Sequence, residues 1–143
     1  MEYSLLSLFL LSFAASTILP LGSEWYLALE ISRNKPLITV VFIATAGNYL
    51  GALTTYIIGR LGATFLITNV LRVKQERAEK SMHLYQKYGV WSLLFSWLPV
   101  VGDPLVLVAG VYKTNLILFT FLTLLGKFIR YFIVATTVSM TIN

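Results

Sequence analysis

Residues 98–103 (LPVVGD) and residues 19–24 (LPLGSE) are the two segments that decide the fold of this chain. In each segment a proline inside an apolar stretch is followed four positions later by an acidic residue, Asp103 or Glu24. The two segments are 79 residues apart in the sequence. Their likeness predicts that the chain contains the same structural unit twice.

The likeness extends into the apolar stretch that follows each segment. At the same offset, Gly47-Asn48 aligns with Gly126-Lys127, and Gly51 aligns with Arg130. Chance recurrence of prolines and glycines in apolar sequence is the alternative explanation. Because one register aligns both features, we favour a duplicated unit of a broken hairpin followed by a helix.

The composition indicates that the lipid bilayer is the solvent of the chain. Of 143 residues, 57% are hydrophobic and 12% are charged, which is about half the charged fraction of a typical soluble domain. A soluble fold of this size leaves about a third of its unfolded surface exposed and could not bury so much apolar area. The net charge of +5 does not predict nucleic-acid binding, because most basic residues lie between apolar runs.

The residue types also argue against several kinds of chemistry. The chain has no cysteine and one histidine, His83, which disfavours disulfides, thiol catalysis and histidine–metal sites. We therefore expect no catalytic residues, no metal and no cofactor. The sequence predicts a membrane protein that is not an enzyme.

Four apolar stretches predict an all-α integral membrane fold; they are residues 5–21, 37–58, 90–112 and 116–142. The second and fourth are uninterrupted and long enough to cross a hydrocarbon core of about 30 Å. The first is broken by Pro20, and the third is broken by Pro99 and Pro104. Broken helices are tolerated at membrane depth where protein or a wet cavity satisfies the backbone, so we expect two re-entrant hairpins whose breaks face inward.

A polar connector, residues 60–88, joins the two units and reads as an interfacial amphipathic helix. Its basic residues place it in the cytoplasm by the positive-inside rule. One crossing before the connector makes the two units inverted, a plan that recurs in secondary transporters. The expected domain is therefore 1–143, divided into a first unit (1–59), the connector (60–88) and a second unit (89–143).

Four ionisable residues fall inside these apolar units: Glu24, Asp103, Lys127 and Arg130. An ionisable side chain at the centre of a span costs roughly 2.5 to 3.5 kcal/mol, so the four must pair or meet water. Glu24 and Asp103 are candidates for proton exchange, although either could be purely structural. Lys127 and Arg130 share one helix face and could bind a phosphate head group or join the last span to the hairpins. Asn48, the equivalent of Lys127, is a further candidate for the same cavity.

The chain resembles the DedA (VTT-domain, SNARE-associated Golgi protein) membrane family, and within it the YqaA-like branch. The resemblance lies in LPLGSEWYLAL at 19–29, GNYLGALTTYIIGRLG at 47–62, YGVWSLLFSWLPVVGDPLVLVAG at 88–110 and GKFIRY at 126–131. It implies opposed re-entrant hairpins in a bacterial inner (plasma) membrane. It also implies movement of phosphate-bearing lipids across the membrane, as in undecaprenyl phosphate recycling and phospholipid flipping or scrambling, with dependence on the proton-motive force.

The resemblance assigns family positions to residues of this chain. Glu24 matches the family's membrane acid, and the remaining motif positions are Pro20, Tyr56, Gly59, Arg60, Pro99, Gly102 and Gly110. The chain departs from the family where typical members carry arginines, at Ser96 and Gly102, and where they carry an acid, near Ala52. Lys127 and Arg130 could replace the missing arginines from the neighbouring span.

The sequence therefore predicts a DedA-type transport protein that moves a phospholipid or polyprenyl phosphate, with proton coupling as one option. A carrier of small ions or polar solutes and a non-transporting membrane scaffold are the alternatives. The expected partners are membrane lipids and their anionic head groups, with homo-oligomers left open and nucleic acid excluded.

Overall fold

A computed structural model describes residues 2–16, 23–62, 75–96 and 102–142. All regular structure in these ranges is helical, as the sequence predicts. The elements are α1 (Glu2–Ala15), α2 (Glu24–Ser32), α3 (Leu37–Leu61), α4 (Gln75–Tyr88), the 3-10 helix η2 (Gly89–Phe95), α5 (Gly102–Val111) and α6 (Leu116–Ile142). The expected breaks at Pro20 and Pro99 lie outside the described residues. Pro104 does not break the chain, because it lies in the first turn of α5, where a proline is tolerated.

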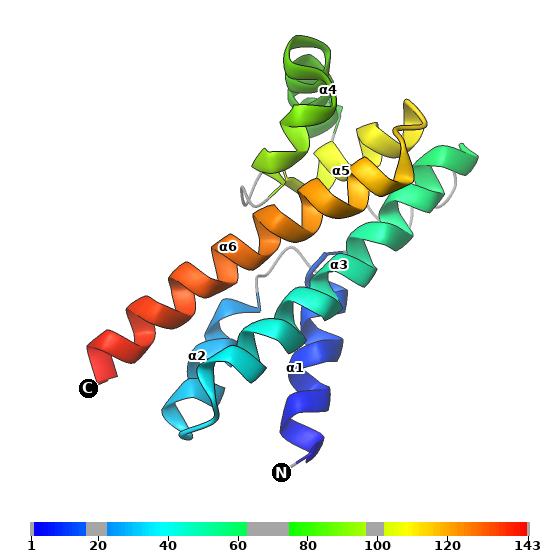
Figure 1. Ribbon diagram of the computed structural model, residues 1–143. Helices are drawn as coiled ribbons and strands as arrows, with labels where there is room; N and C mark the ends of the chain where they lie inside the picture. The colour runs from blue at the N-terminus through cyan, green and yellow to red at the C-terminus, as the bar shows by residue number, and fades with distance from the viewer. Residues whose placement is uncertain (1, 17–22, 63–74, 97–101, 143) are drawn as a thin grey trace.

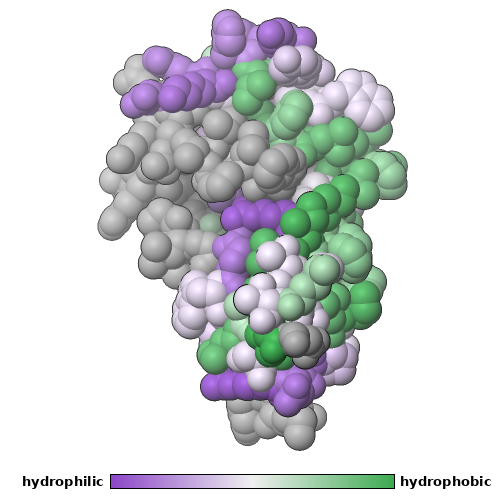
Figure 2. Space-filling model, turned by 90° about the vertical axis from the view of Figure 1, so that its left-hand side faces the viewer, coloured by the Kyte–Doolittle hydropathy of each residue, from purple (hydrophilic) through white to green (hydrophobic). Residues whose placement is uncertain are grey.

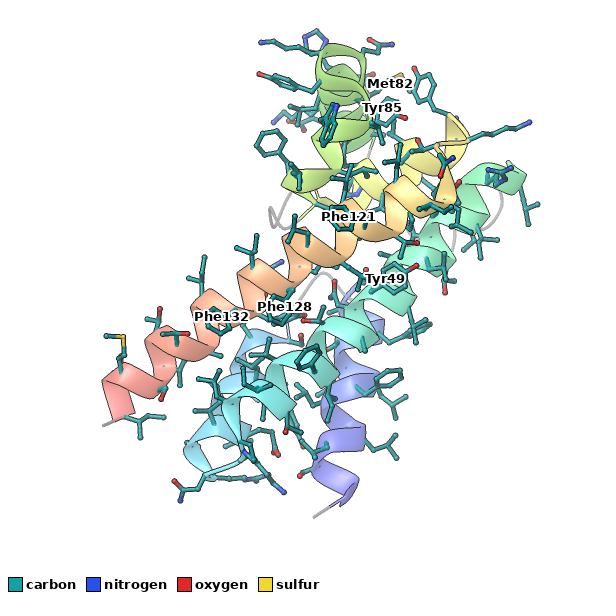
Figure 3. All side chains as sticks on the ribbon, in the orientation of Figure 1. Tyr49, Met82, Tyr85, Phe121, Phe128 and Phe132 are labelled. Carbon is teal, nitrogen blue, oxygen red and sulfur yellow. The ribbon has the colours of Figure 1, made fainter. Side chains whose placement is uncertain are left out.

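Helices α3 and α6 are the two long apolar elements, with 25 and 27 residues. At 1.5 Å per residue they measure about 37 to 40 Å, enough to cross a bilayer. They run side by side in opposite directions (Figure 1), and Tyr49 reaches from α3 to bond Thr120 of α6 at 2.7 Å (Figure 3). Helices α1 and α2 lie at one end of this pair, and α4 and α5 lie at the other (Figure 1). The described apolar parts of α1 and α5 are too short to span.

Helix α1 packs closely on α3 because two glycines remove the side chains between them. A Cβ at Gly47 would lie 2.4 Å from the Phe9 carbonyl oxygen, and one at Gly51 would lie 2.5 Å from that of Phe13. Small residues four positions apart are a usual means of close helix approach in membranes. The Gly47-Asn48-x-x-Gly51 motif thus allows α1 to pack directly against α3.

The turns that precede the two long helices have the same local structure. Asn34, between α2 and α3, and Lys113, between α5 and α6, both have positive φ, at 62° and 54°. The amide of Asn34 donates to the Ile31 carbonyl at 3.0 Å, and the amide of Lys113 donates to the Gly110 carbonyl at 2.9 Å. Each residue and each partner is 79 positions from its counterpart, and so are the first residues of α3 and α6. The offset found in the sequence therefore also relates helix boundaries and hydrogen bonds.

The start of the connector differs from the prediction, whereas its predicted end at residue 88 coincides with the end of α4 at Tyr88. Helix α3 continues to Leu61, so Arg60 belongs to its last turn rather than to the connector. Within the connector, the described helix is α4, which begins at Gln75 and carries most of its charged residues on an exposed face. Tyr85 of α4 stacks on Tyr112 at a ring separation of 4.9 Å, which joins the connector to the end of α5.

Two apolar cores lie along the α3–α6 pair, one toward each end. The first gathers Leu8, Leu27 and Val40 with Tyr131 and Ala135. The second is built from residues further along α3 and earlier in α6: Ala52, Tyr56, Leu93, Val106, Ala109, Phe119 and Leu122. The stretch between the cores, around residue 48 of α3 and residue 127 of α6, is where the ionisable residues lie.

Candidate functional site

Asn48 and Lys127 occupy the layer between the two apolar cores. Both side chains are buried, and the Lys127 ammonium donates a hydrogen bond to Asn48 Oδ1. The amide nitrogen of Asn48 donates in turn to the carbonyl oxygen of Ser12 in α1, at 3.0 Å. Because each residue lies near the middle of its long helix, this contact ties α3 and α6 together at mid-span.

Asp103 approaches the same ammonium group from α5. Its Oδ1 lies 3.7 Å from Lys127 Nζ and accepts a hydrogen bond of 3.4 Å from the Ser16 hydroxyl of α1. Ser16 and Ser12 are four residues apart on one face of α1. The polar contacts therefore connect α1, α3, α5 and α6 in a closed ring around the lysine.

Glu24 and Arg130 form the second ion pair of the layer, between the start of α2 and the middle of α6. The residues next to this pair in the sequence, Ser23 and Tyr131, carry hydroxyl groups that support it. Ser23 and Tyr131 share a hydrogen bond of 2.7 Å, and Ser12 donates to Ser23 at 3.0 Å. These hydroxyls hold α1, α2 and α6 together beside the pair. We call the five residues Glu24, Asn48, Asp103, Lys127 and Arg130 the polar layer.

The charges of the polar layer balance, since two carboxylates face two cations. Removing one member of a buried pair leaves its partner uncompensated and typically costs about 3 to 5 kcal/mol. Each charge of the polar layer is therefore compensated by a side chain of the protein itself. The polar layer also presents lysine and arginine groups that could exchange their carboxylate partners for another anion, such as a phosphate.

The structure brings together every residue that the sequence singled out for transport and head-group binding. The hydroxyl partners Ser12, Ser16, Ser23 and Tyr131 were missed. The available signal was modest: Ser23 precedes Glu24 and Tyr131 follows Arg130, so each lies beside an ionisable residue in the sequence.

Four of the family-motif residues lie where α3 crosses α5: Tyr56, Gly59, Arg60 and Gly110. Pro20 and Pro99 lie outside the described residues. Tyr56 donates to the carbonyl oxygen of Thr114 in the α5–α6 turn, and Arg60 donates to the Tyr56 hydroxyl at 3.1 Å. A Cβ at Gly59 would lie 2.5 Å from the Leu107 carbonyl oxygen, and one at Gly110 would lie 2.1 Å from that of Tyr56. These residues therefore allow close packing and fix the turn before α6.

Gly102 has a similar packing role at the start of α5. A Cβ there would lie 2.1 Å from the carbonyl oxygen of Ser96. Ser96 also approaches Gly126, whose Cβ would lie 3.3 Å from the serine hydroxyl oxygen. Glycine at both positions lets the end of η2 pack beside the residues that precede Asp103 and Lys127.

Glu30 is a buried acid that the sequence did not single out. Its side chain is fully buried in the last turn of α2, where Oε1 pairs with Arg33 at 3.0 Å. Its Oε2 has no hydrogen-bond partner among the residues the structure describes. Glu30 lies three residues before Arg33, which is the spacing of an ordinary surface ion pair on a helix. The sequence therefore does not reveal that Glu30 is buried. Within the same residues, no group of three or more acidic, histidine or cysteine side chains is placed to hold a metal ion.

The family model of the VTT domain matches residues 19–140 of the chain. This range includes α3, the polar layer and all of α6 except its last two residues. The chain therefore belongs to the VTT-domain, or DedA, family of membrane proteins.

Individual relatives agree with this assignment. The chain is 41% identical over 133 residues to the inner membrane protein YqaA of Escherichia coli, covering 92% of this chain and 89% of the relative. It is 37% identical over 136 residues to an uncharacterized protein of Haemophilus influenzae, covering 90% and 83%. It is 25% identical over 112 residues to undecaprenyl phosphate transporter A of Staphylococcus aureus, covering 73% and 55%. No solved structure matches the chain.

The relatives and the two long apolar helices together place the protein in the bacterial inner membrane. The expected family and location are thus confirmed. The low fraction of charged residues had already indicated that the bilayer is the solvent of the chain.

Proposed function

We propose that the protein moves a phosphate-bearing lipid across the inner membrane and that its head group passes through the polar layer. The observation that carries this proposal is the placement of Lys127 and Arg130 in the middle of an apolar helix, each paired with a carboxylate from a short helix. Ionisable residues at mid-span are costly and mark transport pathways when they occur.

A phosphate group suits these cations. Arginine offers a planar fork that binds phosphate oxygens in pairs, and lysine adds a compact charge. The relative named undecaprenyl phosphate transporter A supports a lipid of this kind, either a polyprenyl phosphate or a phospholipid. Transport of this type needs binding and release, without a cofactor or a catalytic nucleophile.

We propose that the protein is a single membrane domain of two inverted units, 1–59 and 89–143, with the connector 60–88 in the cytoplasm. The Lys127–Asn48 contact supports this, because it joins two residues that the repeat makes equivalent. In a pair of units related by a two-fold axis, a residue meets its own equivalent only at the axis. The opposite directions of α3 and α6 (Figure 1) fit the same arrangement, as do re-entrant hairpins at each end.

Glu24 and Asp103 are the proposed proton sites. When a phosphate takes their place on Arg130 and Lys127, the released carboxylate loses its cation and gains affinity for a proton. Binding of an anion with a proton keeps the polar layer neutral. Proton coupling then follows from charge balance, since an uncompensated charge in this layer is costly.

Purified protein in lipid vesicles tests this function. We expect faster transbilayer movement of fluorescent phospholipids or polyprenyl phosphate than in empty vesicles, with a further change when a pH gradient is imposed. Ion-sensitive dyes in matched vesicles distinguish a carrier of small ions. Ion flux without lipid movement would support that alternative. Absence of both activities would support a non-transporting membrane scaffold.

A further inference from the structure

We infer that the Glu24–Arg130 pair lies at a side opening toward the lipid, through which the phosphate head group enters the polar layer directly from the bilayer. This inference rests on the proposed function and deepens it, because it names the source of the phosphate. A lipid brings its head group sideways and leaves its acyl chains in the membrane, whereas a free phosphate ion arrives from water.

The exposure of the charged side chains differs across the polar layer. Lys127 is 3% exposed, whereas Arg130 and Glu24 are 26% and 25% exposed and Asp103 is 45% exposed. Arg130 lies next to the midpoint of α6, so its exposed part is far from both ends of the span. A charged group facing hydrocarbon at that depth is costly unless a polar group or water reaches it.

Apolar residues border this opening. Trp25, next to Glu24, is 60% exposed, and Ile133, one turn beyond Arg130, is 58% exposed. Figure 2 shows a hydrophilic patch halfway along one face of the molecule, with hydrophobic residues on one side of it. A charged spot with an apolar border at mid-depth matches an amphiphile, because acyl chains can cover the border while the phosphate reaches the cation.

The exposures also give an order to the two cations. Arg130 is reached first from the side, and Lys127 lies deeper, against Asn48 at the centre of the α3–α6 contact. Exchange of the Glu24 carboxylate for phosphate on Arg130 therefore precedes contact with Lys127. Arg130 is the entry residue, and Lys127 is the inner binding residue.

Fluorescence quenching in vesicles can test the side opening, because the chain has no native cysteine. The probe is a bimane label on Ile133→Cys, and the quenchers are phosphatidylcholines with a nitroxide on the head group or deep on the acyl chain. The matched control is a label on Phe42→Cys. Phe42 has a similar exposure of 59% and lies six residues from Asn48, as Ile133 lies six residues from Lys127.

The control position lies away from the proposed opening. The Phe42 ring is 5.6 Å from that of Phe128, which with Phe132 forms a stacked pair along α6 (Figure 3). Phe128 lies two positions before Arg130 in α6, which places the two side chains about 200° apart around the helix. A label at 42 therefore samples the same depth on the opposite side of α6.

We expect head-group nitroxides to quench the label at 133 severalfold more than the label at 42, while acyl-chain nitroxides quench both. Arg130→Gln should remove the head-group quenching at 133, and Lys113→Gln, at the exposed α5–α6 turn, should leave it unchanged. Equal head-group quenching at 133 and 42 would overturn the side opening.

Lipid movement measured on the same vesicles separates this inference from the proposed function. Transport without selective quenching at 133 would overturn the side opening and leave the transport function standing. Selective quenching without transport would support the side opening as a lipid-binding site and contradict transport.

Discussion

Lys127 of α6 donates a hydrogen bond to Asn48 of α3, and the two residues are 79 positions apart, the offset that also relates the two broken segments and the two positive-φ turns. The contact therefore joins two positions that the proposed repeat makes equivalent. One of them carries a charge and the other a neutral amide. The asymmetry places one cation, Lys127, at the contact between α3 and α6.

This relationship predicts that the cation can be exchanged between the repeats. Lys127→Asn should lower the stability by about 3 to 5 kcal/mol, because Asp103 loses its buried partner. The double change Asn48→Lys with Lys127→Asn should recover much of that loss, since both side chains reach the same point. Thermal unfolding in detergent measures the stability of each variant. A double variant that is no more stable than Lys127→Asn would argue against equivalent positions.

The second ion pair predicts a coupling between Glu24 and Arg130. In a double-mutant cycle of Glu24→Gln and Arg130→Gln, we expect an interaction free energy of unfolding between about 0.5 and 3 kcal/mol. The matched control is the exposed Glu76–Lys80 pair of α4, at 3.5 Å, where an i,i+4 surface pair should couple by about 0.3 to 0.5 kcal/mol. Strictly additive losses at Glu24 and Arg130 would show that the pair does not interact.

The close crossing of α3 and α5 predicts that the family-motif glycines are structural. Gly110→Ala places a methyl group against the Tyr56 carbonyl oxygen, and such overpacking costs about 1 to 3 kcal/mol. Gly126→Ala is the milder control, because its nearest atoms lie 3.3 Å away. We expect a lower melting temperature for Gly110→Ala with unchanged transport per folded molecule. Normal melting with lost transport would instead assign Gly110 to the transport pathway.

Part of this structure was predictable because it depends on residue type and spacing. Length and apolar composition define α3 and α6 without reference to any partner, and the recurrence of proline and acid is the sequence pattern on which the proposed repeat rests. The pairing of each acid was not predictable, because it depends on how α2 and α5 pack against α6. The hydroxyl partners Ser12 and Ser16 give no periodic signal in an apolar helix. Glu30 looks like a solvated residue beside Arg33 until the packing of α2 buries it.

The inverted arrangement predicts opposite membrane sides for the α2–α3 turn and α4. Asn34 and His83 are exposed residues of these two segments. Cysteine introduced at Asn34 should react with an impermeant reagent added outside spheroplasts, and cysteine at His83 should react only after lysis. Labelling of both from outside would contradict the topology.

Glu24 should tolerate aspartate better than glutamine if it exchanges protons. Glutamine keeps the size and an accepting oxygen but cannot titrate. We expect Glu24→Gln to lose the pH dependence of transport and Glu24→Asp to retain it. Normal pH dependence in Glu24→Gln would assign the carboxyl a structural role.

The most direct test of the central claim is the rate of transbilayer lipid movement in vesicles that contain the wild type, Lys127→Asn, or the double variant Asn48→Lys with Lys127→Asn, each at equal amounts of folded protein. If the polar layer binds the head group through its central cation, the single variant loses transport and the double variant regains it. Transport at the wild-type rate by Lys127→Asn would contradict the account.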